Sequence, residues 1–267
     1  MTNFLSDKEK KVSREFEKNG FVVKDISNQE YLKKIRKIFI NSIKKNIKIG
    51  SEFNNDESLL NFVHKKIKPN KLNSFRMNII NQINKNKDVR KLYYQVSREY
   101  LDILIGNELA MQLRINLSIQ LPNDNSSLLP LHSDVWSGDS PYEMVAWLPL
   151  VDCYKTKAMY ILPPNKYKKL KKIFISGKNT SSSKIFSKIK KDLKWINIKF
   201  GQVLLFNQCL PHGNVINREN ETRWSLNCRF KSVFSPYKDK KIGEFFEPIS
   251  LRKISQLAIN YKLPEIK

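Results

Sequence analysis

The sequence predicts a mainly β fold with flanking helices, in which short antiparallel strands form a barrel or a double-sheet jelly roll. Three observations lead to this prediction. The first hundred residues repeat apolar side chains at helical spacing, the residues from 111 onward change to a two-residue alternation, and turns separate the strands that follow. The length of 267 residues, with 40% hydrophobic content, is sufficient for one substantial core.

The N-terminal region, residues 1–105, is expected to be helical and to pack on the core. Within 31–43 the apolar residues Ile35, Ile38, Phe39 and Ile43 follow a helical period, and 89–105 repeats apolar residues in the same way. The segment between these two helices, 50–69, is expected to be a loop-rich connection.

The core is expected to span residues 106–237. Its first strand is predicted at 111–121, where polar residues from Arg114 to Gln120 alternate with apolar ones, and a turn follows at 122–127. Further strands are predicted at 143–150, 158–162, 195–200, 203–207 and 223–233.

Two segments lie outside this pattern of strands. Residues 163–194 are rich in Lys and Ser and include SGKNTSSSK, which is typical of a surface insertion. Residues 238–267 are expected to form a C-terminal extension, with a helix at 249–261.

The formal charge of +24 has two interpretations, a lysine-rich solvated surface or a basic patch for an anionic partner. Residues 101–150 contain no lysine, whereas 151–200 contain fourteen. This distribution favours the solvated surface, so nucleic acid is not the favoured partner. The longest apolar runs are too short to span a bilayer, and an odd number of cysteines, three, favours reduced thiols. We therefore expect a cytoplasmic protein without a membrane span.

Two of the three histidines form a pattern that iron chemistry requires. His132 and Asp134 stand two residues apart after a predicted strand, so both side chains can reach one metal, and His212 follows the strand at 203–207. Two histidines and one carboxylate with open positions are typical of non-haem Fe(II) oxygenases. A His-x-Asp pair alone is a weak signal, and the remaining histidine, His64, has no acidic partner at ligand spacing and is expected to be no ligand.

Eleven residues after His212, Arg223 begins a strand and is followed by Ser225. An arginine and a hydroxyl suit the distal carboxylate of 2-oxoglutarate. The polar face of this strand continues with Asn227 and Arg229, and it either faces water or lines a polar cavity. The spacing from His212 favours the cavity.

These residues resemble the 2-oxoglutarate/Fe(II) dioxygenase superfamily, in the branch that includes phytanoyl-CoA hydroxylase. The strings NLSIQLP, SLLPLHSDVWSGDSP, WLPLVDC, LPHGN, ETRWSLNCRF and FFEPIS are more specifically similar to the sporadic carbohydrate-cluster 2-oxoglutarate/Fe(II) oxygenases. The resemblance covers about residues 105–250. It implies a double-stranded β-helix, iron bound by His132, Asp134 and His212, and 2-oxoglutarate held by Arg223 and Ser225.

The resemblance also implies roles for neighbouring residues. In related oxygenases a polar residue on the strand before the His-x-Asp pair helps to hold 2-oxoglutarate, which suggests Gln120 or Asn116; structural or substrate hydrogen bonding is the alternative. Trp136, Asn227 and Arg229 are candidates for the substrate side. For Trp136 the alternative is ordinary packing at the rim, and Arg229 is the second candidate anchor for 2-oxoglutarate.

The function implied is oxidation, in particular hydroxylation, of a carbohydrate or sugar nucleotide in surface-polysaccharide biosynthesis. Fe(II) would be the cofactor, 2-oxoglutarate and dioxygen the co-substrates, and succinate and carbon dioxide the released products. Two alternatives stay open. One is a nucleic-acid demethylase of the alkylation-repair type, suggested by the basic charge and by the six-residue spacing of Arg223 and Arg229. The other is a non-redox, cupin-like metal-binding barrel.

Overall fold

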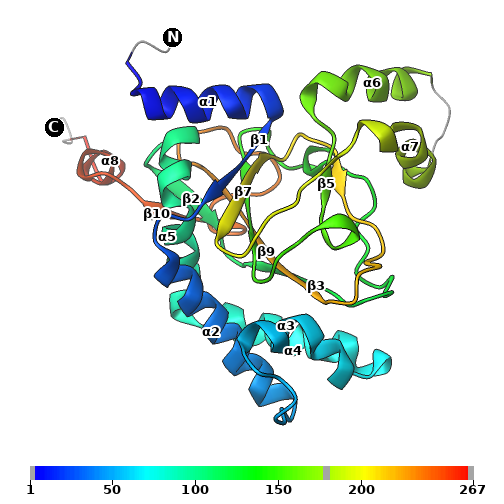
Figure 1. The fold of residues 1–267 in the computed structure, drawn as a ribbon. Helices are drawn as coiled ribbons and strands as arrows, with labels where there is room; N and C mark the ends of the chain where they lie inside the picture. Colours follow the sequence, from blue (N-terminus) through cyan, green and yellow to red (C-terminus); the bar gives the residue numbers. More distant parts are fainter. Residues whose placement is uncertain (1–3, 177–180, 264–267) are drawn as a thin grey trace.

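The computed structural model describes residues 4–176 and 181–263 as antiparallel sheets with helices packed around them (Figure 1). Parts of the predicted insertion (177–180) and extension (264–267) lie outside the described residues. The α-helices are α1 Asp7–Asn19, α2 Gln29–Asn46, α3 Asp56–Phe62, α4 Leu72–Lys85, α5 Lys87–Leu104, α6 Tyr167–Ile175, α7 Ser182–Ile189 and α8 Lys253–Ile259. The strands are β1 Phe21–Asp25, β2 Leu109–Gln112, β3 Asn116–Gln120, β4 Met144–Pro149, β5 Tyr160–Ile161, β6 Lys194–Trp195, β7 Gln202–Asn207, β8 His212–Gly213, β9 Arg223–Ser232 and β10 Phe246–Ser250.

The larger sheet is built around β9. Its order is β1-β7-β4-β9-β2-β10, and β3 also pairs with β9. Every pair is antiparallel, and β3 and β2 pair with successive halves of β9, as in Ser118↔Ser225 and Met111↔Phe230. Strand β9 therefore lies inside the sheet, and most of its residues are buried.

The smaller sheet has the order β6-β5-β8. An isolated antiparallel bridge between His132 and His212 extends it by one position beyond β8. From β3 onward the chain passes repeatedly between the two sheets.

Helices cover the face of the larger sheet that points away from the smaller sheet. The apolar side of β9, Trp224, Leu226, Cys228 and Phe230, belongs to the same core cluster as the buried faces of α2, α4 and α5. Tyr93 of α5 is fully buried and donates a hydrogen bond from its hydroxyl to the carbonyl of Ala146, at 2.8 Å. The indole N–H of Trp224 donates to the carbonyl of Leu60 in α3, at 2.9 Å. The polar side of β9 is thereby left to face the second sheet.

The observed elements confirm the antiparallel strands with flanking helices. The predicted mainly β content is not observed, because helical residues outnumber strand residues in the described part of the chain. The strand predicted at 111–121 is two strands, β2 and β3. The loop predicted at 50–69 contains α3, and the insertion at 163–194 contains α6 and α7. Strand β1 lies in the region predicted to be helical. No helix in the described ranges is long and apolar enough to cross a membrane.

Candidate active site

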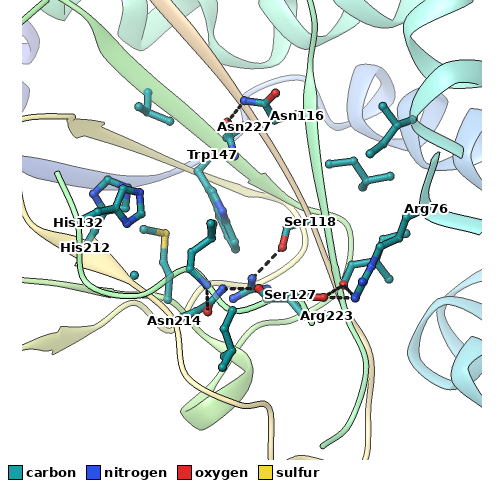
Figure 2. A pocket seen from close by; sticks show the side chains of 18 of the residues that line it. Arg76, Asn116, Ser118, Ser127, His132, Trp147, His212, Asn214, Arg223 and Asn227 are labelled. Atoms are coloured by element: carbon teal, nitrogen blue, oxygen red, sulfur yellow. Dashed lines mark hydrogen bonds between the residues drawn. The ribbon is translucent and has the colours of Figure 1, made fainter. Parts of the chain in front are cut away.

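His132, Asp134 and His212 converge at the bridge that extends the smaller sheet. One potential ligand atom from each of these side chains lies within 4.8 Å of the other two. The backbones of His132 and His212 exchange two hydrogen bonds, at 3.0 and 2.8 Å, and Figure 2 shows the two imidazoles side by side. Asp134 begins the short 3-10 helix η3, Asp134–Ser137, immediately after the bridge.

Both imidazoles are held in one orientation by backbone carbonyls. Nδ1 of His132 lies 2.8 Å from the carbonyl oxygen of Pro130, and Nδ1 of His212 lies 2.9 Å from that of Leu210. A carbonyl only accepts, so Nδ1 of each ring donates to it, and Nε2 is the nitrogen that is left to face a metal. Burial lowers the pKa of His212 to about 4, which keeps its imidazole neutral at physiological pH.

The segment that carries Asp134 is tied to the segment that carries His212. The backbone N–H of Asp134 donates to the carbonyl of Gln208, at 3.2 Å. The hydroxyl of buried Ser133 lies 3.0 Å from the carbonyls of both Gln208 and Cys209. The three candidate ligands are therefore held by backbone contacts that need no bound ion, and their donor set suits a divalent transition metal.

The three side chains border a cavity of about 520 Å³ between the sheets, and Arg223 lies in the same cavity. Arg223 is 2% exposed. Its guanidinium makes one hydrogen bond, from Nη2 to the hydroxyl of Ser118 at 2.9 Å (Figure 2). Its Nε and Nη1, and the buried hydroxyl of Ser225, have no partner among the described residues. Three residues of the polar face of β9, Arg223, Asn227 and Arg229, thus line the cavity, whereas Ser225 is buried outside the lining.

Burial lowers the pKa of Arg223 to about 10, so the guanidinium stays charged at neutral pH. A buried cation without an anionic partner is costly, and a ligand carboxylate would supply the missing partner. The orphaned donors of Arg223 therefore fit a carboxylate-bearing molecule that also reaches the metal ligands.

The other predicted site residues divide into two groups. Asn116 and Asn227 line the cavity and are joined by a hydrogen bond of 2.9 Å (Figure 2). Gln120 is buried beside Arg223 on the paired strand β3, outside the cavity lining, and donates to the carbonyl of Val215 at 2.5 Å. Trp136 is 43% exposed, lies outside the lining as well, and packs edge-on against Phe174 of α6, with the ring centroids 5.4 Å apart.

Arg229 also borders the cavity, but its guanidinium is occupied. Nη2 lies 3.2 Å from Oδ2 of Asp134, and Nε donates to the side-chain carbonyl of Gln208 at 3.1 Å. The structure therefore gives Arg229 a different environment from that of Arg223, although the two stand on one face of one strand.

Part of the lining was not anticipated from the sequence. Helix α4 contributes Asn73, Arg76, Met77 and Ile80, the loop before His132 contributes residues 126–129, and Asn214 and Trp147 complete the wall. Arg76 donates to Asp124 at 2.8 Å and to the carbonyl of Ile119 at 2.7 Å, which fastens α4 to β3 and to this loop. The contribution of α4 depends on tertiary contacts, and local pattern in the sequence carries no signal for it.

No protein-family model matches the chain, and no curated protein matches it. Several solved structures are similar to the chain. A nickel complex of the non-heme monooxygenase ThoJ has a TM-score of 0.56 at 12% identity, covering 90% of this chain and 84% of the other. EctD from S. alaskensis in its apo form has a TM-score of 0.57 at 14% identity, with coverage of 89% and 81%. The non-heme alpha ketoglutarate dependent carbocyclase SnoK from nogalamycin biosynthesis has a TM-score of 0.54 at 12% identity, with coverage of 92% and 97%.

The chain has the fold of these non-heme oxygenases. At such low identities the likeness concerns the fold alone. The chemistry of the site is therefore argued from the residues of this chain.

Proposed function

We propose that the protein is an Fe(II)- and 2-oxoglutarate-dependent dioxygenase. The observation that carries this proposal is the buried guanidinium of Arg223, which lies in the same cavity as His132, Asp134 and His212 and has two nitrogens, Nε and Nη1, without a partner among the described residues. A metal site alone requires no such cation. A dicarboxylate that chelates the metal at one end and meets Arg223 at the other accounts for both features.

Each residue has a task in this proposal. His132, Asp134 and His212 would hold Fe(II), which supplies the activation of dioxygen coupled to decarboxylation of 2-oxoglutarate. Arg223 and Ser225 would bind the distal carboxylate. The hydrogen bond from Arg223 to Ser118 fixes one edge of the guanidinium and leaves Nε and Nη1 free for the ligand. The apolar walls, with Trp147 and Met159, would exclude water from this end of the cavity.

We further propose that the two sheets form a double-stranded β-helix. The chain alternates between them, since β3, β4, β7 and β9 lie in the larger sheet and the His132 bridge, β5, β6 and β8 lie in the smaller one. This arrangement supports a jelly-roll core that brings ligands from distant strands to one end.

The substrate that we propose is a carbohydrate or an activated sugar. Away from the metal ligands and Arg223, the lining consists mainly of amides, hydroxyls and aliphatic side chains, including Asn73, Asn116, Asn227 and Met77. Its two other cations, Arg76 and Arg229, are both engaged by carboxylates. Neutral hydrogen-bonding groups suit hydroxyl-rich molecules better than they suit a phosphate or a charged amine. A role in surface-polysaccharide biosynthesis in the cytoplasm is part of this proposal.

The two alternatives fit these observations less well. A repair demethylase stacks an extruded base between aromatic or apolar side chains, and the aromatic lining residues in the described part of the chain, Trp147 and Phe206, are both buried. Phe206 is also packed against the His212 imidazole, with ring centroids 4.9 Å apart. A non-redox barrel leaves Arg223 without a purpose.

Coupled turnover tests the substrate proposal. Iron-loaded protein is incubated with 2-oxoglutarate, dioxygen and either a panel of nucleotide-linked sugars and glycans or methylated oligonucleotides, and succinate is measured. We expect at least one carbohydrate, and no oligonucleotide, to raise succinate above the uncoupled background. Demethylation of an oligonucleotide that disappears in His132→Ala would replace the carbohydrate proposal by the repair alternative.

A further inference from the structure

Arg229 is surrounded by acceptors in the described structure. Its Nη2 lies 3.2 Å from Oδ2 of Asp134 and 3.7 Å from Oδ2 of Asp139. Its Nε donates to Gln208 at 3.1 Å, and its Nη1 lies 3.4 Å from the side-chain oxygen of Gln112. All three guanidinium nitrogens therefore have partners within the protein, which leaves Arg229 poorly placed to bind a ligand carboxylate.

The contact with Arg229 gives the two oxygens of the Asp134 carboxylate different surroundings. Oδ1 lies 3.6 Å from Nε2 of His132, on the side of the candidate metal site, whereas Oδ2 faces Arg229. An ion pair to one oxygen favours one rotation of the carboxylate. The other oxygen is then left for the metal.

We propose that Arg229 is a positioning residue for Asp134: its ion pair with Oδ2 would orient the carboxylate so that Oδ1 is left for the metal. The inference rests on the proposed function and assigns Arg229 to the metal ligand, in place of the substrate or the distal end of 2-oxoglutarate. Arg223 and Arg229 thus have separate tasks, although both project from the same face of β9. Partners that orient metal ligands typically change metal affinity or activity by about 10- to 100-fold when they are lost.

Arg229 is itself held in place by a charge-balanced cluster. Asp139 is 2% exposed and forms a second ion pair with Lys240, from the segment between β9 and β10. Gln208 is fixed from the other side, because its amide nitrogen donates to the carbonyl of Ser140 at 2.7 Å and to Glu143 at 3.0 Å. Two carboxylates, Asp134 and Asp139, face two cations, Arg229 and Lys240, so the cluster orients the Asp134 carboxylate before a metal arrives.

Metal titration of the apo-protein tests this inference without reference to turnover. Arg229→Lys and Arg229→Gln are compared with Arg223→Lys and with Arg14→Gln, which removes an exposed arginine of α1. Affinity for Mn(II) is measured under anaerobic conditions, 2-oxoglutarate affinity is measured at saturating metal, and the melting temperature of each apo-protein is recorded. Arg229→Lys keeps the charge and covers the case in which Arg229→Gln does not fold.

We expect Arg229→Lys to weaken Mn(II) binding by about 10- to 100-fold. Its 2-oxoglutarate affinity at saturating Mn(II) should stay within about threefold of wild type. Arg223→Lys should show the reverse pattern, and Arg14→Gln should match wild type in both measurements. Wild-type Mn(II) affinity in folded Arg229→Lys, or a loss confined to 2-oxoglutarate binding, would overturn the positioning role and leave the proposed function standing. Wild-type protein that binds no divalent transition metal would overturn both.

Discussion

The backbones of His132 and His212 are hydrogen bonded to each other in both directions, at 3.0 and 2.8 Å, although they come from distant parts of the sequence. Their imidazole centroids lie 4.3 Å apart. Because the two residues are direct partners in one antiparallel bridge, their side chains are brought together by strand pairing alone. The metal site is thus a product of the sheet, and the ion need only bind to groups that are already in place.

Loss of any one of the three ligands should abolish metal binding and leave the fold intact. In His132→Ala, Asp134→Ala and His212→Ala the backbone bridge can persist, since the hydrogen bonds that form it come from main-chain atoms. Each variant removes one of three protein ligands, so we expect little bound iron and no turnover. Metal content and circular dichroism of the purified variants check this expectation.

His64→Ala is the matched control for these substitutions. Nδ1 of His64 lies 2.9 Å from the hydroxyl of Thr222, and the residue is not among those that line the cavity. Its removal should leave iron content and turnover unchanged. An iron content in His212→Ala equal to that of His64→Ala would show that the ligand set is wrong.

Arg223→Ala should weaken binding of 2-oxoglutarate and retain iron. Loss of a charge-assisted contact costs about 2–4 kcal/mol, or roughly 30- to 1000-fold in apparent affinity. Ser225→Ala should have a smaller effect, because a neutral hydroxyl contributes less than a guanidinium. Isothermal titration of the metal-loaded protein measures both. Unchanged 2-oxoglutarate affinity in Arg223→Ala would remove this residue from the co-substrate site.

Asn227→Leu tests the side of the cavity assigned to substrate. The amide of Asn227 accepts a hydrogen bond from Asn116 inside the cavity, at 2.9 Å. Replacing it by an apolar group of similar size should raise the KM for a coupled carbohydrate by about 3- to 10-fold, the equivalent of one neutral hydrogen bond. Metal and 2-oxoglutarate affinities should not change. Steady-state kinetics with and without the carbohydrate distinguish this result from a general loss of activity.

Tyr93 should make a large contribution to stability, because it joins α5 to the larger sheet. Its ring stacks on Phe230, and its hydroxyl donates to the carbonyl of Ala146. Tyr93→Phe loses one hydrogen bond and should lower the free energy of unfolding by about 0.5–1.5 kcal/mol. Tyr93→Ala should lower it by about 3–5 kcal/mol. Denaturant unfolding checks both, with Tyr261→Phe, which alters an exposed residue, as the control.

Local sequence pattern could identify site residues of uncommon residue types that stand close together in the sequence or within one strand. The pair His132 and Asp134 sits at a spacing that a strand end can use, and Arg223 begins a strand whose alternation separates polar from apolar side chains. By contrast, the partners of Arg229 are Gln112, Asp134, Asp139 and Gln208, which stand on separate segments of the sequence. Only the folded chain brings those segments together, so the occupied state of Arg229 was not predictable.

The same distinction applies to the fold. Helices α2 and α5 are long and strongly amphipathic, and both were predicted. Strand β1 was missed because it is short, lies among charged helical segments, and pairs with β7 far along the chain. Helix α3 did have a local signal, since Asn55 caps it and exchanges hydrogen bonds with Ser58 in a capping box.

The most direct test of the proposed chemistry is formation of succinate by the purified protein. Anaerobically prepared protein is loaded with Fe(II) and 2-oxoglutarate, dioxygen is admitted, and succinate and carbon dioxide are measured with and without the carbohydrate panel. We predict equal amounts of the two products, a requirement for added iron, and loss of both in His212→Ala. Succinate formation by wild-type protein no greater than that of His212→Ala under every condition would contradict an Fe(II)- and 2-oxoglutarate-dependent function.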